Sequence, residues 1–193
     1  MNSEKWDKYH EQALKDGSSP PWESDEPFHF IKQLISTNTI LKQGLSIVDL
    51  GCGSSETAIY LAKSGLRVTA IDISSIGPPF IFIALERAQM KPNSELVQWV
   101  QADILSNDLF HIVKSLDYDV VFDMQCFQVL RTIDEARAVQ VIHTLLKPGG
   151  YAIIVTGASL TEHSSENTSG PALLTKVQLE IPFTNHNFEL VSI

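Results

Sequence analysis

Compact apolar segments alternate with amphipathic segments along most of the chain. The apolar segments have the length of buried strands, and they span residues 46–50, 67–72, 95–102, 119–123 and 151–156. Helical patterns surround them at residues 27–38, 56–64, 80–90, 108–116 and 133–146. Strands that alternate with helices favour right-handed β-α-β units and a parallel sheet covered on both faces. The pattern therefore predicts an α/β doubly wound domain.

The two ends of the chain depart from this alternation. Residues 1–28 predict a short helix and then an ordered loop, because the run Ser-Ser-Pro-Pro at 18–21 cannot continue a helix. Residues 157–170 are rich in turn formers and predict a surface loop. A last helix at 173–179 and a last strand at 188–193 complete the predicted elements.

Length and composition indicate one globular domain over residues 1–193. A chain of 193 residues fits a single hydrophobic core, and 44% hydrophobic against 19% charged residues is too apolar for a disordered chain. No apolar run has the length of a membrane span, and the polar N-terminus lacks the core of a signal peptide. We therefore expect a soluble, cytoplasmic protein.

Charge and residue types exclude several other classes. Fourteen basic against 23 acidic residues give a net charge of −9, which disfavours binding to nucleic acids or anionic membranes. The two cysteines have no zinc-ligand spacing, and the six histidines have no H-x-x-x-H spacing, so no metal site is expected. No G-x-S-x-G run is present, which disfavours an α/β-hydrolase.

Candidate chemistry begins where the first predicted strand ends. Gly51 and Gly53 stand in the turn between this strand and the next helix, where glycine permits positive φ and a close ligand. Asp72 ends the next strand roughly 20 residues further on, a spacing at which a carboxylate can accept hydrogen bonds from ribose hydroxyls. The alternatives are a tight turn without a ligand and an aspartate that caps a helix.

The nature of the ligand follows from Glu56. This residue occupies the position of the third glycine in a dinucleotide fingerprint, where its carboxylate would repel a pyrophosphate. A cofactor with a ribose but no phosphate fits better. S-adenosylmethionine is the obvious candidate.

Five motifs in order give the chain a family resemblance. The runs at 47–53, 68–74, 101–104, 118–123 and 145–151 resemble the motifs of class I S-adenosylmethionine-dependent methyltransferases. Near the N-terminus, Trp6, Tyr9, the Pro-Pro-Trp run at 20–22 and the Glu-Pro pair at 26–27 are similar to the small-molecule branch that includes thiopurine and tellurite-resistance methyltransferases.

The resemblance implies a Rossmann-like sheet of strand order 3-2-1-4-5 with a marginal C-terminal strand, and an N-terminal segment that covers the cofactor. It implies contacts of the glycine turn with the methionine half, of Asp49 with the ammonium, of Asp72 with the ribose and of Asp103 and Ile104 with the adenine. The implied cofactor-binding residues are Trp22, Asp49, Gly51, Cys52, Gly53, Asp72, Ile73, Asp103, Ile104, Asp123 and Met124. The chain departs from the family at Ser55, where a third glycine is common, in a longer loop at 74–79 and in the lack of a seventh strand.

The expected reaction is methyl transfer to a small-molecule acceptor. Such a displacement needs alignment and exclusion of water rather than a catalytic residue, and we assign none. Residues 124–131 offer amides but no histidine, which favours a soft sulfur, selenium or tellurium nucleophile. A nucleotide-dependent oxidoreductase, a protein-lysine methyltransferase and a catalytically silent cofactor-binding module stay open as alternatives. The oligomeric state also stays open, since the unpaired edge of the fifth strand could pair with another chain.

Overall fold

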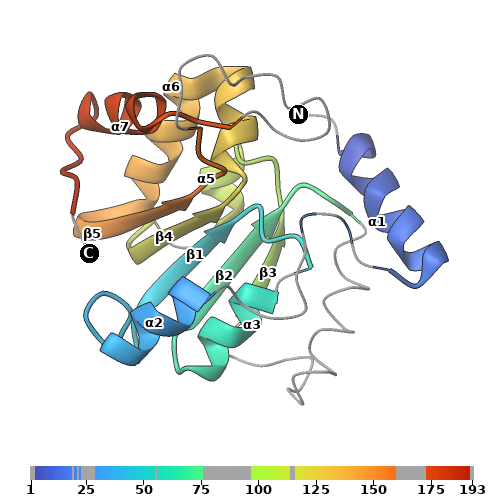
Figure 1. The fold of residues 1–193 in the computed structure, drawn as a ribbon, viewed down its shortest axis with the longest axis horizontal. Helices are drawn as coiled ribbons and strands as arrows, with labels where there is room; N and C mark the ends of the chain where they lie inside the picture. The colour runs from blue at the N-terminus through green and yellow to red at the C-terminus, as the bar shows by residue number, and fades with distance from the viewer. Residues whose placement is uncertain are drawn as a thin grey trace.

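The fold is built around a five-stranded sheet. In a computed structural model, the described residues are 3–18, 20, 22, 29–54, 56–75, 97–113, 116–159 and 173–191. The strands are β1 (Ser46–Leu50), β2 (Arg67–Asp72), β3 (Val97–Gln101), β4 (Tyr118–Met124) and β5 (Leu146–Val155). All neighbouring strands are parallel, in the order β3-β2-β1-β4-β5 (Figure 1). The doubly wound fold and its strand order are thus confirmed.

Helices cover both faces of this sheet (Figure 1). They are α1 (Glu4–Asp16), α2 (His29–Thr37), α3 (Glu56–Lys63), α5 (Leu109–Ile112), α6 (Phe127–Leu145) and α7 (Lys176–Thr184). Because successive side chains of a strand point to opposite faces, Ile47 packs into the cluster with α2 and α3, whereas Val48 packs into the cluster with α6 and α7. The two clusters form the core on the two faces of the sheet.

Several predicted boundaries agree closely with the structure. The strands predicted at 46–50 and 67–72 match β1 and β2, and the N-terminal helix is present as α1. The strand predicted from 95 is described from Val97 onward as β3. The helix predicted at 80–90 and most of the loop predicted at 157–170 lie outside the described residues.

The prediction for α6 began too late. We expected a helix at 133–146, but α6 begins at Phe127 and is interrupted at Asp134, whose φ of −155° and ψ of 92° are not helical. The early start has a local cause, since the Asp123 carboxylate at the end of β4 accepts hydrogen bonds from the backbone N–H groups of Cys126 (3.1 Å) and Phe127 (3.0 Å), three and four residues further along the chain. The apolar pattern of the sequence does not reveal this cap.

The predictions for the C-terminal elements were also wrong in detail. The helix expected at 173–179 is α7, which begins three residues later behind a capping box formed by Thr175 and Gln178 and extends to Thr184. The strand expected at 188–193 is not formed over its described part, residues 188–191.

The absent strand has a physical reason in the packing of Phe188. The chain reverses at Asn187, whose φ is 62°, and the Phe188 ring then packs against Phe183 and His143 at centroid distances of 5.4 and 5.7 Å. Leu190 and Val191 follow with 69% and 52% of their surface exposed. Burial of the Phe188 ring on α6 and α7 thus replaces pairing with β5, whose only partner within the described residues is β4.

Candidate functional site

The turn after β1 is held against the end of β2. Gly51 and Gly53 have φ of 69° and 53°, and the N–H groups of Gly51 and Cys52 donate to the Ile71 carbonyl at 2.8 and 3.0 Å. A Cβ atom added at Gly51 would lie 2.5 Å from the Sγ atom of Cys126. Both its backbone conformation and its close contact therefore require glycine at position 51.

Asp72 links this turn to the start of the next loop. Its Oδ2 atom accepts from the Gly53 N–H at 2.9 Å, and its Oδ1 atom accepts from the Ser74 N–H at 2.8 Å. The half-buried carboxylate thus has a structural task at the end of β2. Each carboxylate oxygen has more than one acceptor position, so the same group can also accept from a ribose hydroxyl.

Two further carboxyls are buried at the ends of the central strands. Asp49 on β1 is 3% exposed, and its burial, followed by the charges of Asp123 and Asp72, raises its pKa to about 8. Asp123 on β4 is fully buried, which raises its pKa to about 7 against the lowering effect of the Phe127 and Cys126 N–H groups. Within the described part of the chain, the Asp123 Oδ2 atom has no hydrogen-bond partner.

The segment after β4 turns sharply across the end of the sheet. Gln125 has a φ of 64°, and its N–H donates to the Val155 carbonyl at 2.7 Å. Burial, followed by the charges of nearby aspartates, raises the pKa of the Cys126 thiol well above its ordinary value. This thiol is therefore protonated at neutral pH and is a poor nucleophile.

The end of β3 lies beside the end of β2. The Ala102 N–H donates to the Asp72 carbonyl at 2.9 Å, and the Asp103 Oδ1 atom accepts from the Leu105 N–H at 2.9 Å. Ile104 is buried, whereas Ile73 is half-buried. The structure thus brings the predicted residues at the ends of β1, β2, β3 and β4 to one edge of the sheet.

Trp22 belongs to a cluster of aromatic rings that it forms with residues of α1. It packs edge-on against Tyr9 and Trp6 at centroid distances of 5.1 and 5.5 Å.

Asp7 ties α1 to the loop after β2, because its Oδ1 atom accepts hydrogen bonds from the Ser74 hydroxyl (2.7 Å) and the Ser75 N–H (2.9 Å). Sequence reasoning included Asp7 in the N-terminal resemblance but assigned it no contact, since its partners are more than 60 residues away and leave no local pattern.

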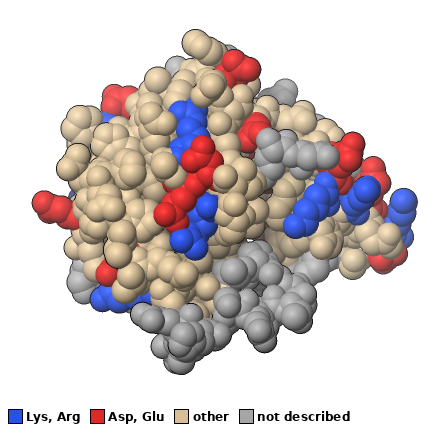
Figure 2. All heavy atoms as spheres, turned by 90° about the horizontal axis from the view of Figure 1, so that it is seen from above, with Lys and Arg blue, Asp and Glu red and all other residues tan. Residues whose placement is uncertain are grey.

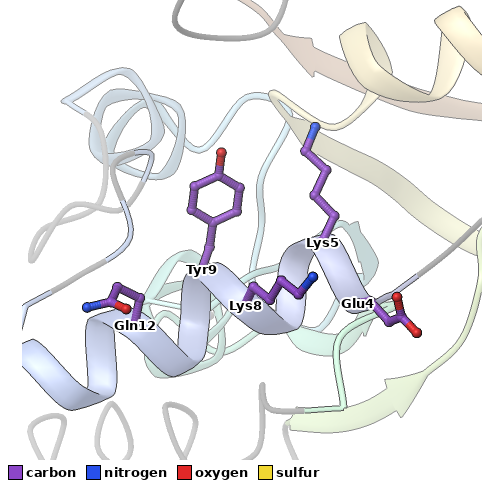
Figure 3. Close-up of a pocket in the computed structure, with 5 residues that line it drawn as sticks. All are labelled: Glu4, Lys5, Lys8, Tyr9 and Gln12. Atoms are coloured by element: carbon purple, nitrogen blue, oxygen red, sulfur yellow. The ribbon is translucent and has the colours of Figure 1, made fainter.

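A cavity of about 540 Å³ lies along α1 (Figure 3). Its lining residues are spaced at i, i+1, i+4, i+5 and i+8, which places them along one side of the helix. They are Glu4, Lys5, Lys8, Tyr9 and Gln12. Sequence reasoning missed this set, although the helical spacing of its polar side chains was a usable signal. Figure 2 shows basic and acidic side chains interspersed at the end of the molecule that α1 forms.

The described residues contain no group of three His, Cys, Asp or Glu side chains that could hold a metal ion. In the same part of the chain, no helix has the length and apolar character that crossing a membrane requires.

Comparison with known proteins adds to this geometry. A family model described as a methyltransferase domain matches residues 47–150, more than half of the chain. The chain belongs to this methyltransferase family. The class I S-adenosylmethionine-dependent class expected from the five motifs is thereby confirmed, and S-adenosylmethionine is the cofactor of that class.

Individual relatives of this methyltransferase domain are more distant. An uncharacterized methyltransferase of Synechocystis sp. is 27% identical over 132 residues, which are 68% of this chain and 54% of the relative. A thiopurine S-methyltransferase of Vibrio atlanticus is 26% identical over 145 residues, which are 73% of this chain and 65% of the relative. The chain thus spans about half to two thirds of the length of these relatives.

The solved structures show the same fold. The crystal structure of the [4+2]-cyclase SpnF superposes with a TM-score of 0.72 at 18% identity, covering 100% of this chain and 74% of that one. The X-ray structure of YjhP from E. coli superposes with a TM-score of 0.64 at 22% identity, covering 88% and 68%. Since a cyclase shares the fold, architecture alone does not establish methyl transfer.

Proposed function

We propose that this chain transfers a methyl group from S-adenosylmethionine to a small-molecule acceptor. The observation that carries the proposal is the glycine turn after β1, held by the Asp72 carboxylate at the carboxyl edge of a parallel sheet. Ligands of open α/β sheets bind at this edge. Membership of the methyltransferase family supports the reaction type.

The residues at the edge fit the chemistry of this cofactor. S-adenosylmethionine carries positive charge on its sulfonium and ammonium groups, and Asp49, Asp72 and Asp123 are all acidic. The missing side chain at Gly51 permits the positive φ of the turn and its close packing against Cys126. Glu56 in the first turn of α3 disfavours a pyrophosphate in the same place.

Each predicted residue has a proposed task. The methionine half lies against the turn formed by Gly51, Cys52 and Gly53, and its ammonium lies at Asp49. The ribose is held by Asp72 and Ile73, and the adenine lies against Asp103 and Ile104.

The remaining residues surround the reacting methyl group and the cofactor as a whole. The methyl-transfer site is bordered by Asp123 and Met124, and the cofactor is covered by Trp22. When bound, the cofactor supplies a methyl group already activated on the sulfonium. The chain itself aligns the two reactants and excludes water.

We further propose a soft acceptor, with sulfur as the first choice. The Cys126 thiol beside the turn is protonated, and residues 124–131 contain no histidine that could remove a proton from an alcohol or amine. The relative from Vibrio atlanticus is named for S-methyl transfer, which supports sulfur.

Calorimetric titration with S-adenosylmethionine, S-adenosylhomocysteine and NAD tests the cofactor. We expect the first two to bind and NAD not to bind; binding of NAD alone would favour an oxidoreductase.

Transfer of a labelled methyl group to a panel of thiols, phenols, amines and a lysine peptide then tests the acceptor. We expect the thiols to be methylated first. Cofactor binding with no transfer to any acceptor would favour the silent binding module.

A further inference from the structure

The loop after β3 carries Asp103 and Ile104, the two residues proposed to contact the adenine. Hydrogen bonds within the loop make it a tight turn. The Asp103 Oδ1 atom accepts from the Leu105 N–H at 2.9 Å, and the Asp103 carbonyl accepts from the Ser106 N–H at 3.0 Å. These bonds set the shape of the turn, whereas its position relative to the helices depends on a residue further along the chain.

That residue is Arg137 on α6. Its Nη2 atom donates to the Ser106 carbonyl at 3.0 Å, and its Nε atom donates to the Leu105 carbonyl at 3.4 Å. The guanidinium also lies over the Phe110 ring, with its Cζ atom 5.1 Å from the ring centroid. A planar guanidinium can span two adjacent carbonyls, whereas a lysine ammonium acts as a point charge. The Arg137 side chain therefore holds both the position and the orientation of the turn.

The break in α6 explains how one helix reaches this loop as well as the far side of the sheet edge. At the break, the Asp134 Oδ1 atom accepts from the Arg137 N–H at 2.9 Å, which caps a new helical segment. Arg137 stands in the first turn of that segment. The part of α6 before the break contacts the end of β5 through Gln128. The two parts of α6 thus serve two different ends of the candidate site.

The positive charge of Arg137 is directed at backbone carbonyls. The residue is half-buried, and within the described part of the chain it forms no ion pair with a carboxylate. Its backbone partners lie about 30 positions earlier, at 31 for Ser106 and 32 for Leu105. A half-buried cation that bonds backbone in this way fixes a loop rather than balancing a charge.

We propose that Arg137 is a positioning residue for adenine recognition, which holds the loop after β3 in the conformation in which Asp103 and Ile104 meet the base. It acts through the loop and makes no contact with the cofactor itself. A loop that is already ordered loses less conformational entropy on binding, so Arg137 raises the affinity. A fixed turn also keeps the Asp103 carboxylate at the 6-amino group of adenine, so a base with oxygen in that place is rejected. This inference rests on the proposed function, because it concerns the same cofactor site.

Calorimetric titration with two ligands measures both effects. S-adenosylhomocysteine carries the 6-amino group, whereas S-inosylhomocysteine carries an oxygen in its place. We expect the wild-type chain to prefer S-adenosylhomocysteine by about tenfold or more, because a carboxylate accepts from the amino group and repels the oxygen. In Arg137→Gln, the affinity for S-adenosylhomocysteine should fall about fivefold and the preference at least about threefold. A side chain that only supported the fold would weaken both ligands equally and leave the preference unchanged.

Two further variants locate the effect. Arg137→Lys keeps the charge but cannot span two carbonyls, so its preference should fall in the same direction, and it serves as the test if the glutamine variant does not fold. Arg67→Gln, at the exposed start of β2, should leave both affinities unchanged.

The possible failures are distinguishable. An unchanged preference in the Arg137 variants, or equal binding of the two ligands by the wild-type chain, would overturn this inference alone. Failure of S-adenosylhomocysteine to bind at all would overturn the proposed function, and this inference with it.

Discussion

At the scale of single residues, the Cys126 side chain packs closely against the backbone of Gly51. We expect Gly51→Ala to be destabilising for two reasons: its φ of 69° disfavours a side chain, and the new Cβ would lie 2.5 Å from the Cys126 Sγ atom. Gly149→Ala is the matched control, since its φ is 78° but no atom lies within 4 Å of the added Cβ. Urea unfolding should show a loss of roughly 1–2 kcal/mol in the control and about 1–3 kcal/mol more in Gly51→Ala. Equal losses would contradict the close contact.

Asp72 is the residue on which the ribose contact depends. We expect Asp72→Ala to weaken S-adenosylhomocysteine at least tenfold, about 1.4 kcal/mol, because the carboxylate both holds the Gly53 N–H and accepts from the ribose. Calorimetric titration measures this change. Ser74→Ala is the control, since it removes only the hydroxyl that donates to Asp7 and keeps the N–H that donates to Asp72. Unchanged affinity in Asp72→Ala would remove this residue from the cofactor site.

At the scale of elements, one buried amide joins α6 to the end of β5. The Gln128 Oε1 atom accepts from the Thr156 hydroxyl at 2.6 Å and from the Gly157 N–H at 3.2 Å. Gln128→Leu would leave both donors without this partner, so we expect a loss of ~1–3 kcal/mol in the free energy of unfolding. Gln140→Leu changes the same residue type on the exposed side of α6 and should cost less than about 0.5 kcal/mol. Similar values for the two variants would show that the link contributes no stability.

At the scale of the whole molecule, the buried carboxyls set the pH dependence of stability. In the folded chain the pKa is about 8 for Asp49 and about 7 for Asp123, whereas the ordinary pKa of an aspartate is 3.8. Both carboxyls therefore bind protons more tightly in the folded chain than in the unfolded chain. Their contribution to stability is complete below about pH 4 and is lost as the pH rises through 7 to 8.

We therefore expect the melting temperature of the cofactor-free protein to fall as the pH rises from about 6.5 to 8 and to level off above pH 8, where both carboxyls are ionised in the folded and unfolded states. The His10 imidazole, whose pKa burial lowers, is neutral in the folded chain over this window and adds little slope. Thermal unfolding at several pH values measures the effect, and Asp49→Asn should flatten it. A melting temperature that stays constant or rises across the window would show that these carboxyls are already ionised in the folded state.

Backbone protection should differ between the centre of the sheet and the C-terminal segment. β1 and β4 are central strands with partners on both sides, whereas residues 188–191 pair with no strand in the described part of the chain. Hydrogen exchange should accordingly be slow at residues 47–50 and 120–122 and fast at 189–191. Equally slow exchange at 189–191 in a demonstrated monomer would mean that this segment has found a strand partner.

The sequence by itself determined the elements of the sheet and most residues of the candidate site. Strand burial follows a local pattern, which is why β1 and β2 were predicted to the residue. The glycine turn and Asp72 were readable because backbone conformation and strand ends depend on near neighbours. The strand order came from the motif resemblance, and the parallel register then brought the strand ends to one edge.

Contacts between residues far apart along the chain were decided only by the tertiary structure. The Phe188 ring packs on His143 of α6 instead of continuing a strand, and Asp7 reaches Ser74 across 67 positions. Burial at the edge of the sheet likewise raises the pKa of Asp49 and Asp123, which an aspartate in a sequence does not reveal. Such effects depend on which groups meet in space and on how much water reaches them, and neither leaves a periodic trace in the order of residues.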